Sequence, residues 1–182
     1  MKYLITVSYD GSKYYGFQRL NNLPSIQKEL EDALSVINKD KVYVKGSGRT
    51  DRGVHALGQK CHFELKYDIP CERLINAINS LLSNYVRVLD CVKVNDDFHA
   101  RFSVKKKIYK IIFKKEKDIL TITFEGKSFY RYMVRNMVGA LLLVGCGKIS
   151  IEEFKNMIDS DENKYTYITA PSNGLYLESV EY

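Results

Sequence analysis

The sequence has 182 residues, of which 45% are hydrophobic, enough to bury one substantial core. This content excludes a disordered chain, and the sequence contains no low-complexity tract and no repeat of solenoid length. Twenty-eight Lys and Arg against 22 Asp and Glu give a formal net charge of +6, which favours a polyanionic partner but also fits a basic protein whose lysines are simply solvated.

The first half of the sequence predicts alternating strands and helices. Strand patterns occur at residues 2–9, 42–44, 60–65 and 86–94. Apolar side chains recur at helical spacing over residues 25–38, where Ser25 fits the N-cap, and along a second helix that Pro70 opens. The order over residues 1–95 is therefore β-α-β-β-α-β, the ferredoxin-like arrangement, in which two helices cover one face of an antiparallel sheet. The other face is left open, and open sheet faces are common platforms for RNA, although this topology also hosts many unrelated activities.

The second half, residues 96–182, predicts a shorter version of this pattern. Strands are expected at residues 109–113, 119–124 and 175–182, with a polar turn at 115–118 and helices at 128–144 and 151–158. Ser150 and Glu153 have the spacing of a capping box at the start of the last helix. The order β-β-α-α-β lacks a helix and a strand relative to the first half. We therefore predict an α+β protein with two ferredoxin-like (RRM-like) halves around an antiparallel sheet, the second half truncated.

The four cysteines and the apolar segments suggest neither a metal site nor a membrane anchor. Cys61, Cys71, Cys91 and Cys146 form no Cys-x-x-Cys pair and have no histidine ladder nearby, so core filling is their expected role. The N-terminal residues lack the pattern of a signal peptide, and the longest apolar stretch, 138–144, is too short to span a bilayer. We expect a cytoplasmic protein.

The segment from Gly48 to Gly53 is the strongest local candidate for a site. It places two glycines, two arginines, a hydroxyl and a carboxylate between two predicted strands, which suits a tight loop with an unusual backbone. The arginines next to Asp51 should keep its carboxylate ionised, and catalytic groups are often carried on such loops. An ordinary turn containing an aspartate has the same local features, so the loop alone leaves both interpretations open.

Residues 48–56 resemble the signature of the TruA-type tRNA pseudouridine synthases, and five further regions resemble that family in its order. These regions are 9–11 with 16–18, 79–82, 98–103, 133–139 and 170–177. The resemblance implies an RNA-modifying isomerase that converts uridine to pseudouridine, most often in the anticodon stem-loop of tRNA. It also implies that no metal or organic cofactor is required.

By this resemblance, three residues carry the chemistry. Asp51 matches the essential aspartate, which must be ionised to act as a nucleophile. Tyr109 matches the tyrosine that packs against the target uracil, and Arg135 matches the basic residue that pairs with the aspartate. Without the resemblance, Tyr109 reads as a core or rim residue and Arg135 as a side chain reaching solvent. A buried, unpaired Arg135 would cost several kcal/mol, which favours Asp51 as its partner.

RNA contacts are expected from basic residues around the loop, because a stacked uridine must be extruded and aromatic and phosphate contacts must offset the lost stacking. The candidates are Arg49, Arg52, His55, Arg101, Lys105, Lys106 and Lys107. Arg49 lies within the signature, whereas the lysines fit a solvated face equally well. His55 reads as a loop-packing or phosphate-side residue rather than a general base.

The chain departs from the family in two places. Family members are longer by several tens of residues, and the resemblance locates the missing stretch between Tyr109 and the helix predicted from residue 128. That stretch helps to form the RNA-binding cleft in the family, so its absence puts homodimer formation and the anticodon stem-loop target in doubt. Arg52 stands where the family generally has a smaller or different residue. The alternatives to an active enzyme are an RNA-binding relative without catalysis and an edited or incomplete sequence.

Overall fold

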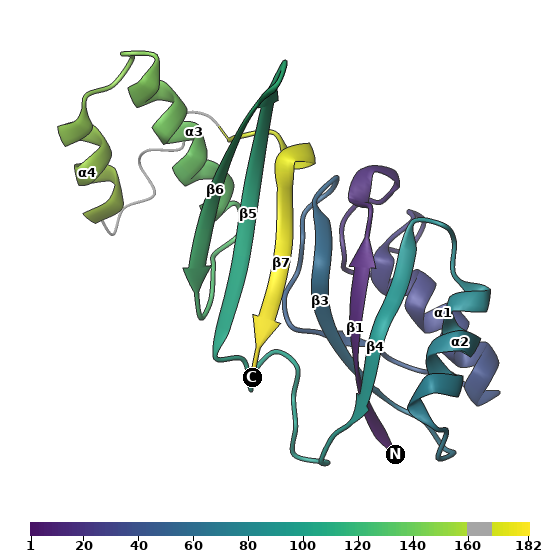
Figure 1. Cartoon of the computed structure of the whole chain (residues 1–182). Helices are drawn as coiled ribbons and strands as arrows, with labels where there is room; N and C mark the ends of the chain where they lie inside the picture. Colours follow the sequence, from purple (N-terminus) through teal and green to yellow (C-terminus); the bar gives the residue numbers. More distant parts are fainter. Residues whose placement is uncertain (160–168) are drawn as a thin grey trace. The chain divides into compact units, whose positions relative to one another are not determined.

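The computed structural model describes residues 1–159 and 169–182, and this part of the chain forms one seven-stranded sheet (Figure 1). The strands are β1 (Lys2–Tyr9), β2 (Lys45–Gly46), β3 (His55–Glu64), β4 (Val86–Lys93), β5 (Lys106–Lys115), β6 (Asp118–Gly126) and β7 (Leu175–Glu181). Their spatial order is β4-β1-β3-β7-β5-β6, and β2 pairs with β3. All pairs are antiparallel except β3 and β7, so the predicted α+β class with a mostly antiparallel sheet is confirmed.

The described contacts divide the chain into two compact units. The larger unit contains residues 1–127 and 173–182, and therefore the whole sheet; the smaller contains residues 128–172. Within the described residues, no helix is both long and apolar enough to cross a membrane.

Helices α1 (Ile26–Asn38) and α2 (Cys71–Leu81) lie together beside the β1 and β4 part of the sheet (Figure 1). Both are amphipathic, and their apolar side chains enter the core, with Leu30 and Leu34 of α1 and Leu74 and Ile78 of α2 completely buried. The order of elements along residues 1–95 is the predicted one, because the apolar spacing switches between periods of two and 3.6 at each element.

Ser25 occupies the N-cap position of α1, as predicted, but its side chain makes no capping hydrogen bond. Its hydroxyl is buried and has no partner among the residues that the structure describes. The carbonyls of Gly16 and Phe17 instead accept from the first helical amides, those of Ile26 and Gln27. The main-chain carbonyls of residues 16–17 therefore cap the start of α1 in place of the Ser25 side chain.

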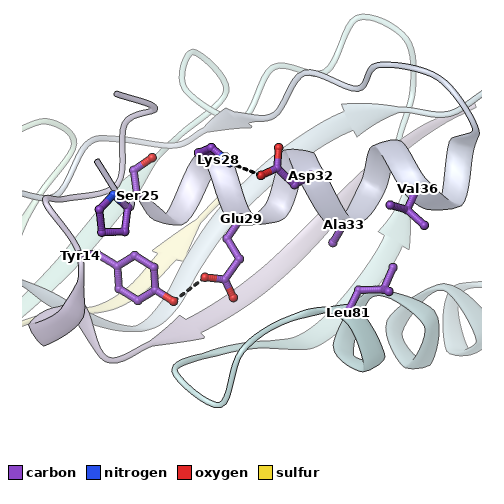
Figure 2. A pocket seen from close by; sticks show the side chains of 9 residues that line it. Tyr14, Ser25, Lys28, Glu29, Asp32, Ala33, Val36 and Leu81 are labelled. Carbon is purple, nitrogen blue, oxygen red and sulfur yellow. Dashed lines mark hydrogen bonds and ion pairs between the residues drawn. The ribbon is translucent and has the colours of Figure 1, made fainter. Parts of the chain in front are cut away.

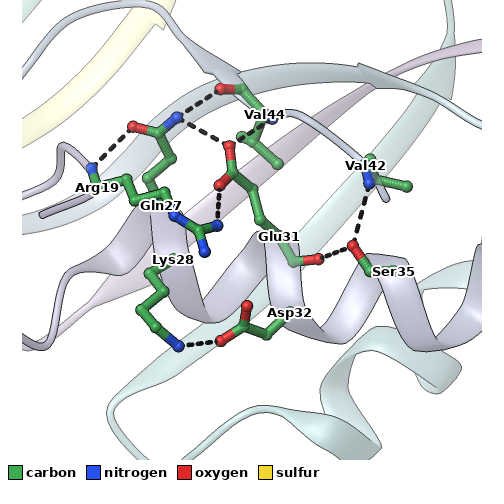
Figure 3. Close-up of polar contacts among 8 residues, drawn as sticks. All are labelled: Arg19, Gln27, Lys28, Glu31, Asp32, Ser35, Val42 and Val44. Carbon is green, nitrogen blue, oxygen red and sulfur yellow. Dashed lines mark hydrogen bonds and ion pairs between the residues drawn. The ribbon is translucent and has the colours of Figure 1, made fainter. Parts of the chain in front are cut away.

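The strand predicted at residues 42–44 is wrong, and the two-residue strand β2 follows it instead. The amides of Val42 and Val44 donate to side chains of α1, to Ser35 Oγ at 3.0 Å and Glu31 Oε1 at 3.0 Å (Figure 3). A backbone whose amides are satisfied by helix side chains has no need of a neighbouring strand. Glu31 is 2% exposed and also accepts from Arg19, so this network ties the approach to the Gly48 loop to α1.

His62 is buried, although a polar side chain that alternates with the apolar Cys61 and Phe63 would be exposed on a half-buried strand. The main-chain amide of Ala100 donates to His62 Nδ1 at 3.0 Å, and the rings of Phe98 and His99 pack edge-on to the imidazole. The segment following β4 thus packs against β3 at His62.

The smaller unit contains helices α3 (Met133–Gly145) and α4 (Ile151–Asp159), which contact each other. Helix α3 begins five residues later than predicted, because Tyr132 has a left-handed backbone with φ of 62° that cannot continue a helix. Helix α4 has the predicted capping box: Ser150 N donates to Glu153 Oε2 at 2.7 Å and Glu153 N donates to Ser150 Oγ at 3.1 Å. The second half therefore has the predicted order β-β-α-α-β.

Candidate active site

The loop of residues 47–54 joins β2 to β3. Its first two carbonyls accept hydrogen bonds from side chains of β5 and β3. Lys107 Nζ donates to the Ser47 carbonyl at 2.8 Å, and Gln59 Nε2 donates to the Gly48 carbonyl at 3.0 Å. Gln59 is completely buried, and its Oε1 accepts from Ser47 Oγ at 2.6 Å. Buried polar side chains with satisfied hydrogen bonds fix a backbone more firmly than exposed ones do.

The segment before α1 and the end of β1 hold the middle of the loop. Phe17 N donates to the Thr50 carbonyl at 3.0 Å, and the hydroxyls of Tyr9 and Thr50 are hydrogen bonded at 2.8 Å. Burial raises the pKa of Tyr9 well above its usual range, so its phenol is neutral. Gly16 packs so closely that a Cβ atom there would lie 2.7 Å from the Thr50 carbonyl oxygen. Asp51 therefore follows a residue that is fixed on both its carbonyl and its hydroxyl.

Asp51 and Tyr109 are brought close enough to interact electrostatically. Tyr109 lies on β5 and is 8% exposed. Burial, followed by the nearby charge of Asp51, raises the pKa of Tyr109 to about 12. Two of the three predicted catalytic residues therefore lie within electrostatic reach of each other, and Tyr109 is a neutral phenol.

The third predicted catalytic residue, Arg135, lies on α3 in the smaller unit. Its Nε donates to the Ala170 carbonyl at 2.6 Å, and its guanidinium lies 5.4 Å from the centre of the Tyr132 ring. Arg135 is half-buried, so it is neither fully enclosed nor free in solvent. Its pairing with Asp51 remains a prediction.

The predicted RNA-binding residues occupy different environments. Arg49, Arg101 and Lys105 are exposed. The Arg52 guanidinium stacks 4.4 Å from the centre of the Tyr15 ring, which gives this unusual residue a partner on the surface. Lys106 pairs with Glu181 at 3.2 Å and more weakly with Glu125, so its charge is already engaged.

His55 and Lys107 are the two predicted RNA-binding residues whose surroundings fit a phosphate contact least. The His55 ring stacks on Tyr176 at 4.7 Å, and its Nδ1 lies 3.1 Å from Asp10 Oδ1, which agrees with the loop-packing interpretation. Lys107 is buried and bonded to main chain, so it is not part of an exposed basic edge with Lys105. Along β5, alternation places Lys107 and its neighbour Lys106 on opposite faces of the sheet.

The model of one protein family, described as tRNA pseudouridine synthase, matches residues 5–103 and again 104–182. The chain belongs to the tRNA pseudouridine synthase family. Three proteins named tRNA pseudouridine synthase A are among its relatives: that of Finegoldia magna is 31% identical, that of Maricaulis maris 31% and that of Phytoplasma mali 29%. Each alignment covers 98% or more of this chain and 98% of the relative.

These family members are longer than this chain. The alignment with the Finegoldia magna protein extends over 239 residues, and this chain has 182. Several tens of the relative's residues therefore have no counterpart here, which agrees with the shortened second half expected from the pattern of strands and helices.

Three residues of this family member's site were missed from sequence. Gly16 and Tyr9 fall within the resembling regions but were given no role, and Gln59 was overlooked. The available signal was the position of Gln59 on the same face of an alternating strand as the apolar Cys61 and Phe63, because a buried amide needs partners. The partners themselves come from residues distant in sequence.

One hollow in the structure lies outside this site. A hollow of about 410 Å³ lies along α1, lined by Tyr14, Pro24, Ser25, Lys28, Glu29, Asp32, Ala33, Val36 and Leu81 (Figure 2). None of these residues belongs to the loop of residues 47–54. Over residues 1–159 and 169–182, no group of three or more His, Cys, Asp or Glu side chains is arranged to hold a metal.

Proposed function

We propose that this chain is a cytoplasmic enzyme that isomerises uridine to pseudouridine in tRNA, with Asp51 as its essential carboxylate. In this reaction the bond between uracil N1 and ribose C1′ breaks, the base rotates, C5 bonds to C1′, and the hydrogen on C5 leaves as a proton. The observation that carries the proposal is the fixed loop of residues 47–51, which holds Asp51 beside the buried phenol of Tyr109. Membership of the family supports the reaction type and the tRNA substrate.

Tyr109 and Asp51 have complementary roles in this proposal. A carboxylate attacks or assists only while it is ionised, and the exposed Arg49 and Arg52 on either side favour that form. Tyr109 is neutral because its pKa is raised to about 12, so it offers a ring for the uracil to pack against without a competing negative charge. By the family resemblance, Arg135 is the proposed basic partner of Asp51.

The exposed basic and aromatic residues near the loop bind the RNA in this proposal. Arg49, Arg101 and Lys105 contact phosphates, and the Arg52 and Tyr15 pair adds a cationic ring surface. Phe102 is 75% exposed with the Arg101 guanidinium 5.9 Å from its ring centre, which is suited to stacking on an unstacked base. Lys106 and His55 contribute less, because acidic or aromatic partners already engage them.

We further propose that residues 1–95 and 96–182 are two ferredoxin-like halves, the second truncated. Two consecutive family matches, over residues 5–103 and 104–182, support a division of the chain near this point. The spatial order β4-β1-β3-β2 is that expected for a β-α-β-β-α-β unit.

The experiment uses tRNA transcripts labelled with tritium at uridine C5, because forming the carbon–carbon bond releases that hydrogen. The wild-type chain is expected to release tritium. Asp51→Asn is expected to abolish release while RNA affinity changes less than about tenfold, or 1.4 kcal/mol. Asp90→Asn, at an exposed aspartate on β4, is the matched control and should retain release.

Two outcomes contradict the proposal. Release that survives Asp51→Asn removes Asp51 from the mechanism. No release by the wild-type chain from any tRNA, with RNA binding retained, identifies an RNA-binding relative without catalysis.

A further inference from the structure

Lys107 is a buried lysine that the reaction as described does not use. It lies on β5 two residues before Tyr109, so both side chains leave the strand on the same face. The residue is 8% exposed, whereas Lys105 is exposed and Lys106 half-buried. Lysine is seldom buried without a paired charge, because desolvating an ammonium is costly.

The surroundings of Lys107 do not neutralise it. Among the described residues no carboxylate forms an ion pair with its ammonium, whose hydrogen bond goes to the neutral carbonyl of Ser47. Burial, and then the positive charge of Arg101, lowers its pKa from the ordinary value. A group held at such a cost to stability is a candidate for a functional role.

The loop is shaped to receive this ammonium. Gly48 has no side chain, and a Cβ atom there would lie 2.9 Å from Lys107 Nζ. Ser47 is four residues before Asp51, and the intervening carbonyls of Gly48 and Thr50 are held by Gln59 and Phe17. Of these loop contacts, the one from Lys107 is made by the strand that also carries Tyr109.

We propose that Lys107 is a positioning residue: its buried ammonium holds the Ser47 carbonyl, and through it the backbone of residues 48–51, where Asp51 stands beside Tyr109. This inference rests on the proposed function, since it concerns the same site. Because Lys107 and Tyr109 lie on the same strand, β5 fixes both the position of the Tyr109 phenol and, through Lys107, the position of the loop that carries Asp51. An error of 1 Å in such a pair can cost about a hundredfold in rate.

The test compares Lys107→Met with Lys105→Met in the tritium-release assay, after wild-type release has been established. Methionine keeps the length of the side chain and removes its charge. Lys107→Met is expected to lower kcat by about ten- to hundredfold, with RNA Kd within about threefold and an unchanged slope of log Kd against log salt. Lys105→Met, at an exposed residue proposed to contact phosphate, is expected to weaken RNA binding and to reduce that slope by roughly one phosphate contact.

Gly48→Ala is a second way to displace the Lys107 ammonium from the Ser47 carbonyl, because the added methyl carbon would lie only 2.9 Å from Lys107 Nζ. It is expected to lower kcat alone but to have little further effect in the Lys107→Met background, since the contact it disturbs is already gone. Thermal unfolding checks folding: Lys107→Met should melt close to wild type, because removing a buried charge that no carboxylate of the described residues neutralises offsets the loss of the donor to the buried Ser47 carbonyl.

Three results overturn the inference. A weaker Kd with a reduced salt slope for Lys107→Met identifies Lys107 as a phosphate contact. Unchanged kcat shows that the loop does not need it, and a lower melting temperature with proportionate loss of activity shows a structural role only. If the wild-type chain releases no tritium, the proposed function fails before this comparison begins.

Discussion

The loop of residues 47–54 and the β5–β6 hairpin are neighbours in the fold of the larger unit but are built very differently. In the loop, the carbonyls of Ser47, Gly48 and Thr50 are each held by a residue distant in sequence. Strand β6 is an edge of the sheet, and its side chains are exposed or half-exposed along its whole length. Several long-range hydrogen bonds therefore fix the loop, whereas few buried side chains stabilise the outer strand of the hairpin.

This difference explains how a shortened family member can keep an intact loop. The residues that support the loop are Tyr9, Phe17, Gln59 and Lys107, and all of them precede the stretch in which the resemblance locates the missing residues. Shortening is therefore expected to affect the hairpin side of the molecule and to leave the support of Asp51 unchanged.

The largest combined effect on stability and activity is expected from Gly16→Ala, which disturbs the contacts that hold the loop. Gly16 has φ of +108°, and a Cβ atom would lie 2.7 Å from the Thr50 carbonyl oxygen. Backbone strain and overpacking together should cost about 3 kcal/mol of unfolding free energy in urea, and tritium release should fall strongly. Gly147→Ala is the control: it is strained at φ of +66° but meets nothing within 4 Å, so about 1 kcal/mol is expected. Equal losses at the two sites would show that close packing against the loop contributes nothing.

Acid should destabilise the loop-bearing part of the sheet through His62. Burial, followed by the neighbouring His99, lowers the pKa of His62 from 6.5 to about 4. The unfolded chain therefore takes up a proton between these values while the folded chain does not, so stability is fully present above about pH 6.5 and is lost as pH falls toward 4. The loss amounts to roughly 3 kcal/mol. Protonation also requires the loss of the hydrogen bond that Ala100 N donates to Nδ1.

Urea unfolding of wild type and His62→Asn between pH 7 and 4 measures this contribution. Asparagine can accept from the same amide but does not titrate in this range. The variant should therefore lose less stability than wild type as the pH falls. Parallel curves for the two proteins would exclude His62 as the source.

A smaller effect is expected for Tyr9→Phe. The change removes a buried hydroxyl and leaves that of Thr50, which is 7% exposed, without its partner. A cost of about 1–2 kcal/mol is expected, together with a lower kcat, because Thr50 precedes Asp51. Tyr67→Phe, at a tyrosine 58% exposed, should change stability by less than about 0.5 kcal/mol. Full activity of Tyr9→Phe would mean that the Thr50 hydroxyl does not help to place the loop.

Much of the fold was predictable because local periodicity decides it. The strands at residues 2–9 and 86–94 and the capping box at Ser150 follow from neighbouring residues alone. The errors arise where distant groups take over. The main chain at Gly16 and Phe17 caps α1 in place of Ser25, and side chains of α1 satisfy the amides at residues 42–44.

The candidate site shows the same division. Asp51 and Tyr109 were identified from a resemblance, and the structure brings them within electrostatic reach. The burial of Lys107 was not predictable from its place in a run of three lysines, because its partner, Ser47, is 60 residues away. Sequence shows which residues carry chemistry, whereas long-range contacts determine which of them are held in place.

The smallest effect is expected at the edge of the hairpin, where Ile119→Thr tests how little that strand depends on its side chains. Ile119 is 65% exposed on β6, and threonine suits a strand equally well, so the unfolding free energy should change by less than about 0.5 kcal/mol. The same exchange at Ile111, which is 1% exposed on β5 of the same hairpin, buries a hydroxyl and leaves a void, and should cost about 2–4 kcal/mol. Urea unfolding measures both variants. A large loss at Ile119 would mean that another surface covers β6 in solution, and the contrast between a supported loop and an open edge would then be wrong.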